Sequence, residues 1–222
     1  MKPVNKIRTA AVIPFFNEEK TVNTVINSVL HYADYVIAVN DGSTDKSLNS
    51  ITASENIHII NLPANQGKGS ALKAGLQKSI EMNFVYAVTL DADMQHDPSF
   101  IPYFVKAAEE YDIVIGNRLN DLSDMPLQRI LSNRITSYLL SVKTGMKIID
   151  SQSGYRIFRT EILEKILPTT TGFEAESEMI IKAARNSFRI GFVGIPTVYG
   201  NEESKIRPVR TIFNFIKVLL LK

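Results

Sequence analysis

The stretch DYVIAVNDGSTD, residues 34–45, joins a run of β-prone apolar residues to a polar loop that contains a glycine. A near-continuous apolar run, without strict alternation, is typical of a strand that is buried on both faces of a sheet. Gly42 permits a turn with positive φ, and Ser43, Thr44 or Asp45 is expected to cap a following helix. The stretch therefore predicts one strand–loop–helix unit of a parallel α/β sheet.

The same pattern recurs along the chain. In the first half, the expected strands cover 10–14, 34–40, 57–61, 84–90 and 112–116, and the expected helices cover 18–31, 44–54, 69–82 and 98–111. In the second half, we expect a helix within 125–145 and strands at 153–159 and 189–198 that flank a helix at 174–186. This order predicts an α/β fold, with a mostly parallel central sheet and helices on both faces. We expect a single domain, because the second half extends the first without a linker or a repeat.

A polar cluster follows each strand expected in the first half. The clusters are residues 17–18, 41–45, 65–69, 91–97 and 117–118. Ligands of such sheets bind beyond the carboxyl ends of the strands, and those ends meet at one edge. The sequence therefore predicts that the clusters form one site.

The composition excludes several classes of protein. The chain has 222 residues, no cysteine and a formal net charge of +2. The absence of cysteine excludes a disulfide scaffold, thiol catalysis and thiolate-bound zinc, and it agrees with a cytoplasmic location. The small net charge gives no global basic field, so no nucleic-acid partner is expected.

The C-terminal segment 212–221 is mostly apolar and contains Lys217. It is shorter than the roughly 18–20 apolar residues of a membrane span. A docked terminal helix and an interfacial membrane helix both remain open, as does a natural chain that continues into a membrane segment. With the basic helix around Arg129 and Arg134, this segment predicts peripheral contact with the cytoplasmic face of a membrane.

Asp91 and Asp93 place two carboxylates at i and i+2 where an expected strand ends. Mg²⁺ and Mn²⁺ prefer oxygen ligands and often take one or two carboxylates together with substrate phosphates. An isolated Asp-x-Asp pair more often marks a strand-ending turn in which one Asp caps a helix. The polar clusters on the same edge favour the metal site here. His96 follows closely, and a hydrogen-bonding role is favoured for it over metal ligation.

The loop NQGKG, residues 65–69, opens an expected helix and suggests a phosphate cradle. Leu72 stands where a dinucleotide fingerprint has its third glycine, and Gly69 stands where a P-loop has Ser or Thr. Neither motif therefore matches. A backbone that approaches a nucleotide and a plain turn both remain open.

These motifs occur in a specific order. They are IPFFNE at 13–18, DGSTD at 41–45, NQGKG at 65–69 and DADMQH at 91–96, extended by GNR at 116–118, SGYR at 153–156 and GFE at 172–174. Together they resemble the family 2 inverting glycosyltransferases with the GT-A fold. Within that family they are similar to the dolichol-phosphate mannosyltransferase and polyprenyl-phosphate glycosyltransferase group. The resemblance spans roughly residues 8–207 and implies inverting transfer from a nucleoside-diphosphate sugar to a polyprenyl phosphate.

The resemblance implies a set of site residues. The nucleotide sugar would contact Pro14, Phe16, Glu18, Asp41, Gly67, Lys68, Asp91, Gln95 and Lys205. Asp91 and Asp93 would bind Mg²⁺ or Mn²⁺ and, with Arg118 and Arg134, would support catalysis. The acceptor would contact Arg118, Arg134, Arg156 and Arg207. Residues 8–118 would form the donor half, 119–207 the acceptor half and 208–222 a terminal helix.

The sequence departs from the family pattern at two places. Members that glycosylate a hydroxyl often carry Glu-Asp near the acceptor, with the Asp as base, and this chain has Glu174-Ala175 there. A hydroxyl acceptor needs a positioned base, whereas a phosphate is already anionic and needs cations to position it. The missing base favours a lipid phosphate. Before Ser204-Lys205, related enzymes often have an Arg and a glycine-rich turn, and residues 199–203 carry two acids instead.

Other functions remain open at this point. A hydroxyl acceptor would need Glu174, Glu176 or Asp150 as the base. A nucleotide-sugar-binding regulator or a catalytically silent subunit would keep the pocket without transfer. A nucleotidyltransferase is disfavoured, because residues 14–18 lack a glycine-rich basic loop for a triphosphate. A membrane-protein partner or a homo-oligomer is compatible with each of these.

Overall fold

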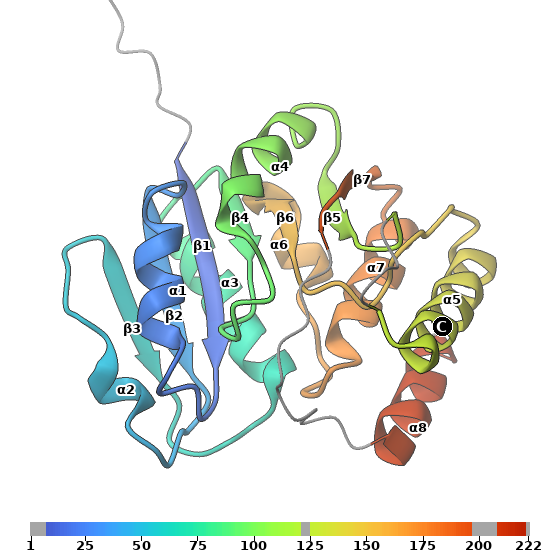
Figure 1. The fold of residues 1–222 in the computed structure, drawn as a ribbon. Helices are drawn as coiled ribbons and strands as arrows, with labels where there is room; N and C mark the ends of the chain where they lie inside the picture. Colours follow the sequence, from blue (N-terminus) through green and yellow to red (C-terminus); the bar gives the residue numbers. More distant parts are fainter. Residues whose placement is uncertain (1–7, 121–124, 197–207, 221–222) are drawn as a thin grey trace, which may run out of the picture.

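The computed structural model describes residues 8–120, 125–196 and 208–220. Its centre is a seven-stranded sheet in the order β3-β2-β1-β4-β6-β5-β7 (Figure 1). The strands are β1 (Thr9–Phe15), β2 (Tyr35–Asn40), β3 (Ile57–Asn61), β4 (Tyr86–Thr89), β5 (Ile113–Asn117), β6 (Arg156–Arg159) and β7 (Ile190–Gly194). Neighbouring strands are parallel except at β6, which is antiparallel to both β4 and β5. The prediction of a mostly parallel α/β sheet is confirmed.

Helices cover both faces of this sheet. They are α1 (Val22–Val29), α2 (Ser47–Ser50), α3 (Lys68–Glu81), the 3₁₀ turn η1 (Pro98–Phe100), α4 (Ile101–Ala107), α5 (Leu127–Thr144), α6 (Thr160–Ile166), α7 (Ala175–Arg185) and α8 (Pro208–Leu219). Helices α1 and α4 lie on one face, and α3, α6 and α7 lie on the other. Helices α5 and α8 lie at the right of Figure 1, where they contact α7 and each other.

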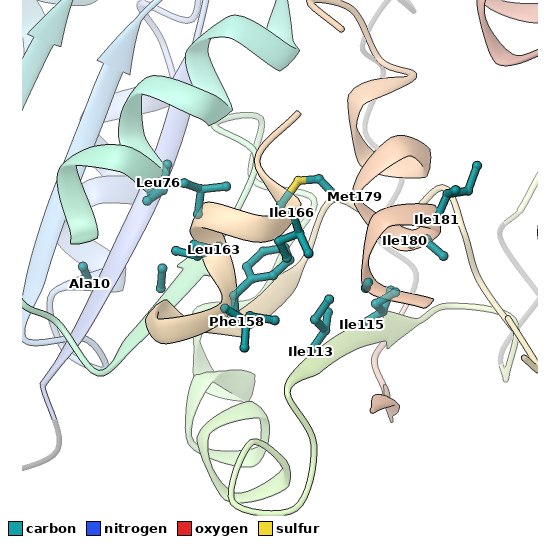
Figure 2. Close-up of a cluster of buried hydrophobic side chains, with 14 of the residues drawn as sticks. Ala10, Leu76, Ile113, Ile115, Phe158, Leu163, Ile166, Met179, Ile180 and Ile181 are labelled. Carbon is teal, nitrogen blue, oxygen red and sulfur yellow. The ribbon is translucent and has the colours of Figure 1, made fainter. Parts of the chain in front are cut away.

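Two apolar cores hold these layers together, one on each side of the sheet. Ala10 and Val12 of β1 belong to the core under α3, α6 and α7, whereas Ala11 and Ile13 belong to the core under α1 and α4. Successive side chains of a strand point to opposite faces, so a strand that is covered on both sides has no polar face. Figure 2 shows the first of these cores, where Leu163 and Met179 pack over the sheet. This double burial explains the continuous apolar runs in the sequence.

Some helices are shorter than the sequence pattern predicts. The helix expected over 18–31 begins at Val22, because the preceding loop is held by side chains of the next loop. The helix expected over 44–54 is limited to Ser47–Ser50. The segment 98–111 begins as a 3₁₀ turn before α4. Polar loop residues therefore form tertiary hydrogen bonds in place of the helical turns that their spacing predicts.

The second half contains one helix that the sequence analysis omitted. Helix α6 follows β6 directly and buries Ile162, Leu163 and Ile166. The expected strand 153–159 is observed only as 156–159, and the expected strand 189–198 ends at Gly194 within the described residues. The i, i+1, i+4 spacing of the three apolar residues in α6 was a usable signal for a helix.

Candidate active site

The loops after β1 and β2 are held together by reciprocal hydrogen bonds. The backbone N–H of Asn17 donates to Oγ of Ser43 (3.0 Å), and the backbone N–H of Thr44 donates to Oδ1 of Asn17 (2.9 Å). The backbone N–H of Glu18 donates to Oγ of Ser47 (2.7 Å). Asn17 has a φ of 55°, a left-handed conformation that Asn tolerates better than most residues. These contacts form a defined wall at the carboxyl ends of the two strands.

A pocket of about 460 Å³ lies beside this wall, at the carboxyl ends of β1, β2 and β3. It is lined by Phe16, Asn40, Gly42, Ser43, Thr44, Leu48, Asn61, Leu62, Pro63, Ala64 and Asn65. Its position is the one that the strand order predicts for a ligand. Among the residues assigned to the nucleotide sugar, Phe16 lines the pocket, whereas Pro14 is buried within β1 opposite Val39.

Asp41 holds the loop that precedes α3. Its Oδ1 accepts from the backbone N–H of Gln66 (2.8 Å) and its Oδ2 from the backbone N–H of Gly67 (2.9 Å). Burial raises the pKa of Asp41, and these two hydrogen bonds act in the opposite direction. Gly67 has a φ of 97°, and a Cβ there would lie 2.4 Å from the carbonyl oxygen of Thr171. The Asp41 carboxylate thus orders this loop, and its contact with a base or ribose stays a prediction.

Lys68 joins two acids at the start of α3. Its Nζ lies 2.6 Å from Oδ1 of Asp91 and 3.1 Å from Oε1 of Glu176. Burial disfavours the ammonium, but the two carboxylates outweigh burial and raise the pKa of Lys68 above its ordinary value. Burial likewise opposes the charge on Asp91, and Lys68 outweighs it, so the pKa of Asp91 lies well below its usual value. A Cβ at Gly154 would lie 2.9 Å from Oδ2 of Asp91, so a larger residue there would displace the side chains of this cluster.

The loop 91–97 is closed by His96. The backbone N–H of Asp91 donates to Nδ1 of His96 (3.0 Å), and the ring centroid of His96 lies 5.1 Å from that of Tyr155. Burial lowers the pKa of His96 to about 4, so the imidazole is neutral near pH 7 and accepts at Nδ1. Within the same loop, the backbone N–H of Gln95 donates to Oδ1 of Asp93 (3.0 Å). The hydrogen-bonding interpretation of His96 is confirmed.

The predicted metal ligands fit a divalent cation that is held partly by its substrate. The side chains of Asp91 and Asp93 are both partly exposed at the sheet edge, and the structure brings them into one loop. Within residues 8–120, 125–196 and 208–220, no three His, Cys, Asp or Glu side chains are gathered as a metal site. Two carboxylates completed by phosphate oxygens and water suit Mg²⁺ or Mn²⁺, which seldom occupy a cage made by protein alone.

Arg118 extends from the end of β5 and is oriented by Asp150. Nε of Arg118 donates to Oδ2 of Asp150 (2.9 Å), Nη2 donates to Oδ1 (3.0 Å), and the backbone N–H donates to Oδ2 (3.0 Å). Burial opposes the charge on Asp150, but the hydrogen bonds with Arg118 outweigh it and lower the pKa of Asp150. The charge of Arg118 also helps to lower the pKa of Asp91, so the two side chains belong to one electrostatic site.

Arg156 occupies a different environment from the predicted acceptor contact. Its side chain is 1% exposed, and its Nε, Nη1 and Nη2 donate to the carbonyl oxygens of Ser153, Glu176 and Ser151. A guanidinium that is buried among backbone carbonyls fixes the loops that provide them. Arg156 therefore supports the site from within the protein and does not face an acceptor.

Of the remaining predicted cations, only Arg134 lies within the described residues. Arg134 is exposed on α5, directly after the buried Asn133. Lys205 and Arg207 lie outside the described residues, as does the segment 199–203.

The role of Glu178 was not predicted from the sequence. This carboxylate is 0% exposed and accepts from the backbone N–H and hydroxyl groups of Thr169 and Thr170, while Lys182 pairs with it at 2.7 Å. The next residue, Thr171, accepts from the backbone N–H of Gly69 (2.7 Å). Glu178 thereby anchors the loop that holds the start of α3. Nothing in the local sequence pattern distinguishes it from a surface glutamate.

Comparisons with known proteins identify the family of this chain. Residues 10–167 match the model of glycosyl transferase family 2. The chain is 30% identical over 238 residues to the UDP-N-acetylglucosamine–dolichyl-phosphate N-acetylglucosaminyltransferase of Methanococcus voltae, over 95% of this chain and 94% of that protein. It is 24% identical over 210 residues to the polyprenol monophosphomannose synthase of Mycolicibacterium smegmatis, over 88% of this chain and 78% of that protein.

The fold is also similar to a solved structure. The glucosyl-3-phosphoglycerate synthase of Mycobacterium tuberculosis, in complex with Mn²⁺, uridine-diphosphate and phosphoglyceric acid, aligns with a TM-score of 0.75 and 21% identity over 96% of this chain and 77% of that one. At this identity the likeness concerns the fold alone. The predicted fold and family are both confirmed by these findings. The chain belongs to glycosyl transferase family 2 and is a glycosyltransferase with the α/β GT-A fold.

Proposed function

We propose that this glycosyltransferase moves a sugar, with inversion, from a nucleoside-diphosphate sugar to a polyprenyl-type lipid phosphate. The observation that carries the proposal is that the three acids available as a catalytic base are already engaged by other side chains. Glu174, Glu176 and Asp150 are the candidate bases, and each already has a hydrogen-bond or ion-pair partner. An acceptor that brings its own negative charge needs no base.

Each of these three acids has a specific partner. Oε1 of Glu176 pairs with Lys68, and Oε1 of Glu174 accepts from Nδ2 of Asn214 on α8 (3.2 Å). Asp150 has both oxygens bound by Arg118 and a side chain that is 0% exposed. A base must reach the proton that it removes, so a fully buried and paired carboxylate is poorly suited to that role.

The donor is assigned to the pocket beyond β1, β2 and β3. Its volume of about 460 Å³ is adequate for a nucleoside, and Asn65, which lines it, belongs to the same loop that leads to Lys68 of the Lys68–Asp91 pair. Asp91 and Asp93 would hold Mg²⁺ or Mn²⁺ there, with Gln95 beside them. A bound cation of this kind neutralises charge that develops on a departing diphosphate. Lys68 and the start of α3 would bind and orient that diphosphate.

The acceptor phosphate is assigned to Arg118, with Arg134 as a second cation. The Asp150 fork presents the Arg118 guanidinium in one orientation, and oriented cations suit an attacking phosphate. Two relatives support a lipid acceptor, because the names of the M. voltae and M. smegmatis proteins include dolichyl phosphate and polyprenol.

Helix α5 supports a location at a membrane surface. Its outward face carries a stripe of exposed apolar side chains, which are Leu127 (82% exposed), Leu131, Ile135, Tyr138 (68% exposed) and Val142. Its inward face buries polar Asn133 and Ser137. No helix in the described part of the chain is long and apolar enough to cross a bilayer. A helix with an apolar outer stripe and basic residues suits the surface of an anionic bilayer.

The experiment that tests this function is a transfer assay with matched acceptors. A panel of nucleoside-diphosphate sugars is incubated with polyprenyl phosphate or with a sugar hydroxyl, in Mn²⁺, Mg²⁺ or a chelator. We expect transfer to polyprenyl phosphate only, inversion at the anomeric carbon by NMR, and a loss of about 100-fold or more in Asp93→Asn. Transfer only to the hydroxyl would contradict the acceptor assignment. Nucleotide binding without transfer to any acceptor would indicate a binding protein instead.

A further inference from the structure

Asp150 lies in the loop between α5 and β6 and is surrounded by donors. Besides the three bonds from Arg118, its Oδ1 accepts from Nδ2 of Asn133 (2.7 Å) and from the backbone N–H of Gln152 (3.2 Å). The side chain is 0% exposed. A buried carboxylate of this kind is stable only while its donors stay in place, because removing one donor leaves a buried charge poorly compensated.

The fork between Asp150 and Arg118 restricts the guanidinium in direction as well as in distance. Two parallel N–H···O bonds to one carboxylate set the plane of the guanidinium. The backbone N–H of Arg118 donates to the same carboxylate, which also ties the end of β5 to it. A single hydrogen bond would leave the long side chain free to rotate about its axis.

Asn133 connects this fork to α5. Its side chain is 1% exposed, its amide group donates to Asp150, and its Oδ1 accepts from Oγ of Ser137 (3.0 Å). Because both ends of the amide have partners, its orientation is fixed. The helix that carries the apolar stripe on its outer face is therefore linked to Arg118 through Asn133 on its inner face and through Asp150 in the loop that follows it.

We propose that Asp150 is a positioning residue that holds Arg118 in the orientation needed by the acceptor, and that Asn133 ties Asp150 to α5. The inference rests on the proposed function, which assigns Arg118 to the acceptor phosphate. It gives Asp150 a role that the sequence left open as a base. Asp150 touches no substrate in this account and acts through Arg118.

The test uses Asp150→Asn, which keeps the shape of the side chain and removes its charge. We expect the KM for polyprenyl phosphate to rise about 10-fold or more, the size typical of losing an orienting partner, while the Kd for the nucleoside diphosphate stays within about 2-fold. Asn133→Ala should shift the same KM in the same direction by less. Gln152→Ala is the matched control, since that side chain is exposed and its backbone N–H bond to Asp150 remains.

A double-mutant cycle separates positioning from a purely structural role. In the Arg118→Gln background, adding Asp150→Asn should change the KM for the acceptor by less than about 2-fold, because the group that it positions is already gone. An equal effect in both backgrounds would overturn the proposal. So would an equal rise in the Kd for the donor. If Asp150→Asn does not fold, the cycle between Asn133→Ala and Arg118→Gln gives the same comparison.

The pH profile distinguishes positioning from general-base catalysis. If Asp150 were the base, Asp150→Asn would lower kcat by about 100-fold or more, and the profile of the residual kcat would lack its acidic limb. We expect that limb to be unchanged. Failure of the proposed function would look different, because the wild type itself would then use a hydroxyl acceptor. The same cycle, run on that acceptor, would still decide whether Asp150 positions Arg118.

Discussion

Helices α1 and α5 are both amphipathic, and they face the protein in opposite ways. Helix α1 buries its apolar residues Val22, Val25, Ile26 and Val29 against the sheet. Helix α5 buries the polar Asn133 and Ser137 together with Leu140, and it exposes its apolar stripe. The sequence pattern of each helix predicts two faces, but only the neighbouring element decides which face is inside. The neighbour of α1 is an apolar strand, whereas that of α5 includes the polar loop that carries Asp150 and Ser151.

The two helices are therefore held by different forces. Burial of an aliphatic side chain contributes about 1.5–3 kcal/mol, and this holds α1 in place. A typical hydrogen bond contributes about 1 kcal/mol net, but a lost partner leaves a buried group unsatisfied at about 1–3 kcal/mol. Helix α5 depends on the second kind of contact. Of its apolar residues, Leu140 packs into the core, whereas Leu127, Leu131, Ile135, Tyr138 and Val142 stay on the surface.

The largest expected effect comes from placing a charge on the apolar face of each helix. Ile26→Asp buries an unpaired carboxylate in the core under α1 and should lower the free energy of unfolding by about 4 kcal/mol or more. Ile135→Asp, on the exposed stripe, should change it by less than about 0.5 kcal/mol. Urea unfolding followed by circular dichroism measures both. Similar losses in the two variants would remove the contrast between the helices.

The second effect is on the pH dependence of stability, and it contrasts Glu178 with Asp41. Burial opposes the charge on Glu178, but Lys182 and the Thr169–Thr170 loop outweigh it and lower the pKa of Glu178 to about 2. This carboxylate should stabilise the fold fully above about pH 4.5, and a contribution on the order of 3 kcal/mol should be lost as pH falls from about 4.5 to 2. Glu178→Gln should flatten the dependence of the unfolding midpoint on pH in that window.

Asp41, in the first half of the chain, serves as a control, because its pKa is shifted in the opposite direction from that of Glu178. Burial raises its pKa above the ordinary value, so its protonation on acidification favours the folded state. Asp41→Asn should therefore steepen the loss of stability below pH 5, where Glu178→Gln makes it shallower. Parallel curves for Glu178→Gln and the wild type would show that the buried glutamate does not govern acid sensitivity.

A third effect concerns the buried polar face of α5. Oγ of Ser137 accepts from the backbone N–H of Ser151 (2.9 Å) and donates to Asn133. Ser137→Ala should cost about 1–3 kcal/mol of unfolding free energy, because these groups stay buried without their partner. Thr24→Ala, on the exposed face of α1, is the matched control and should stay within about 0.5 kcal/mol. A loss in the control as large as that in Ser137→Ala would mean that the inner face of α5 is not special.

The smallest expected effect is on membrane binding. Leu131→Asp removes an apolar contact from the stripe and should weaken co-sedimentation with anionic phospholipid vesicles about 10-fold, with the unfolding free energy unchanged. Tyr103→Asp, an exposed aromatic position on α4, serves as the control and should leave binding as it is. Vesicle binding that is insensitive to Leu131→Asp would contradict the proposal that the stripe contacts a bilayer.

The first half of the chain could be predicted from the sequence better than the second half. The strand expected at 34–40 is observed at Tyr35–Asn40, because double burial leaves a continuous apolar run in the sequence. The loops of Asp41, Gly67 and Asp91 meet as predicted, since parallel strands bring their carboxyl ends to one edge. These conclusions depend on local sequence patterns and on the rule that the carboxyl ends of parallel strands meet at one edge of the sheet.

Other features depend on contacts that no local pattern carries. Arg156 resembles a surface cation in the sequence, but two carbonyl groups of the loop before β6 and one of α7 hold it in the interior. The orientation of α5 depends on the polarity of a loop that follows it. The role of Asp41 as a loop anchor depends on the distance between two loops that are 25 residues apart in the chain. Burial of a polar group is decided by its partners, and these become known only with the tertiary structure.

The reversed direction of β6 has a consequence for where site residues are encoded. In the parallel strands, the loop that follows a strand reaches the ligand edge. In β6, Arg156 pairs with Thr89 at the end of β4, so the loop that precedes the strand arrives there, and Oγ1 of Thr89 donates to the carbonyl oxygen of Gly154 (2.8 Å). One inverted strand thus lets the chain supply Gly154 to the Lys68–Asp91 cluster on its way into the sheet. A motif search in this fold should look upstream of this strand and downstream of the others.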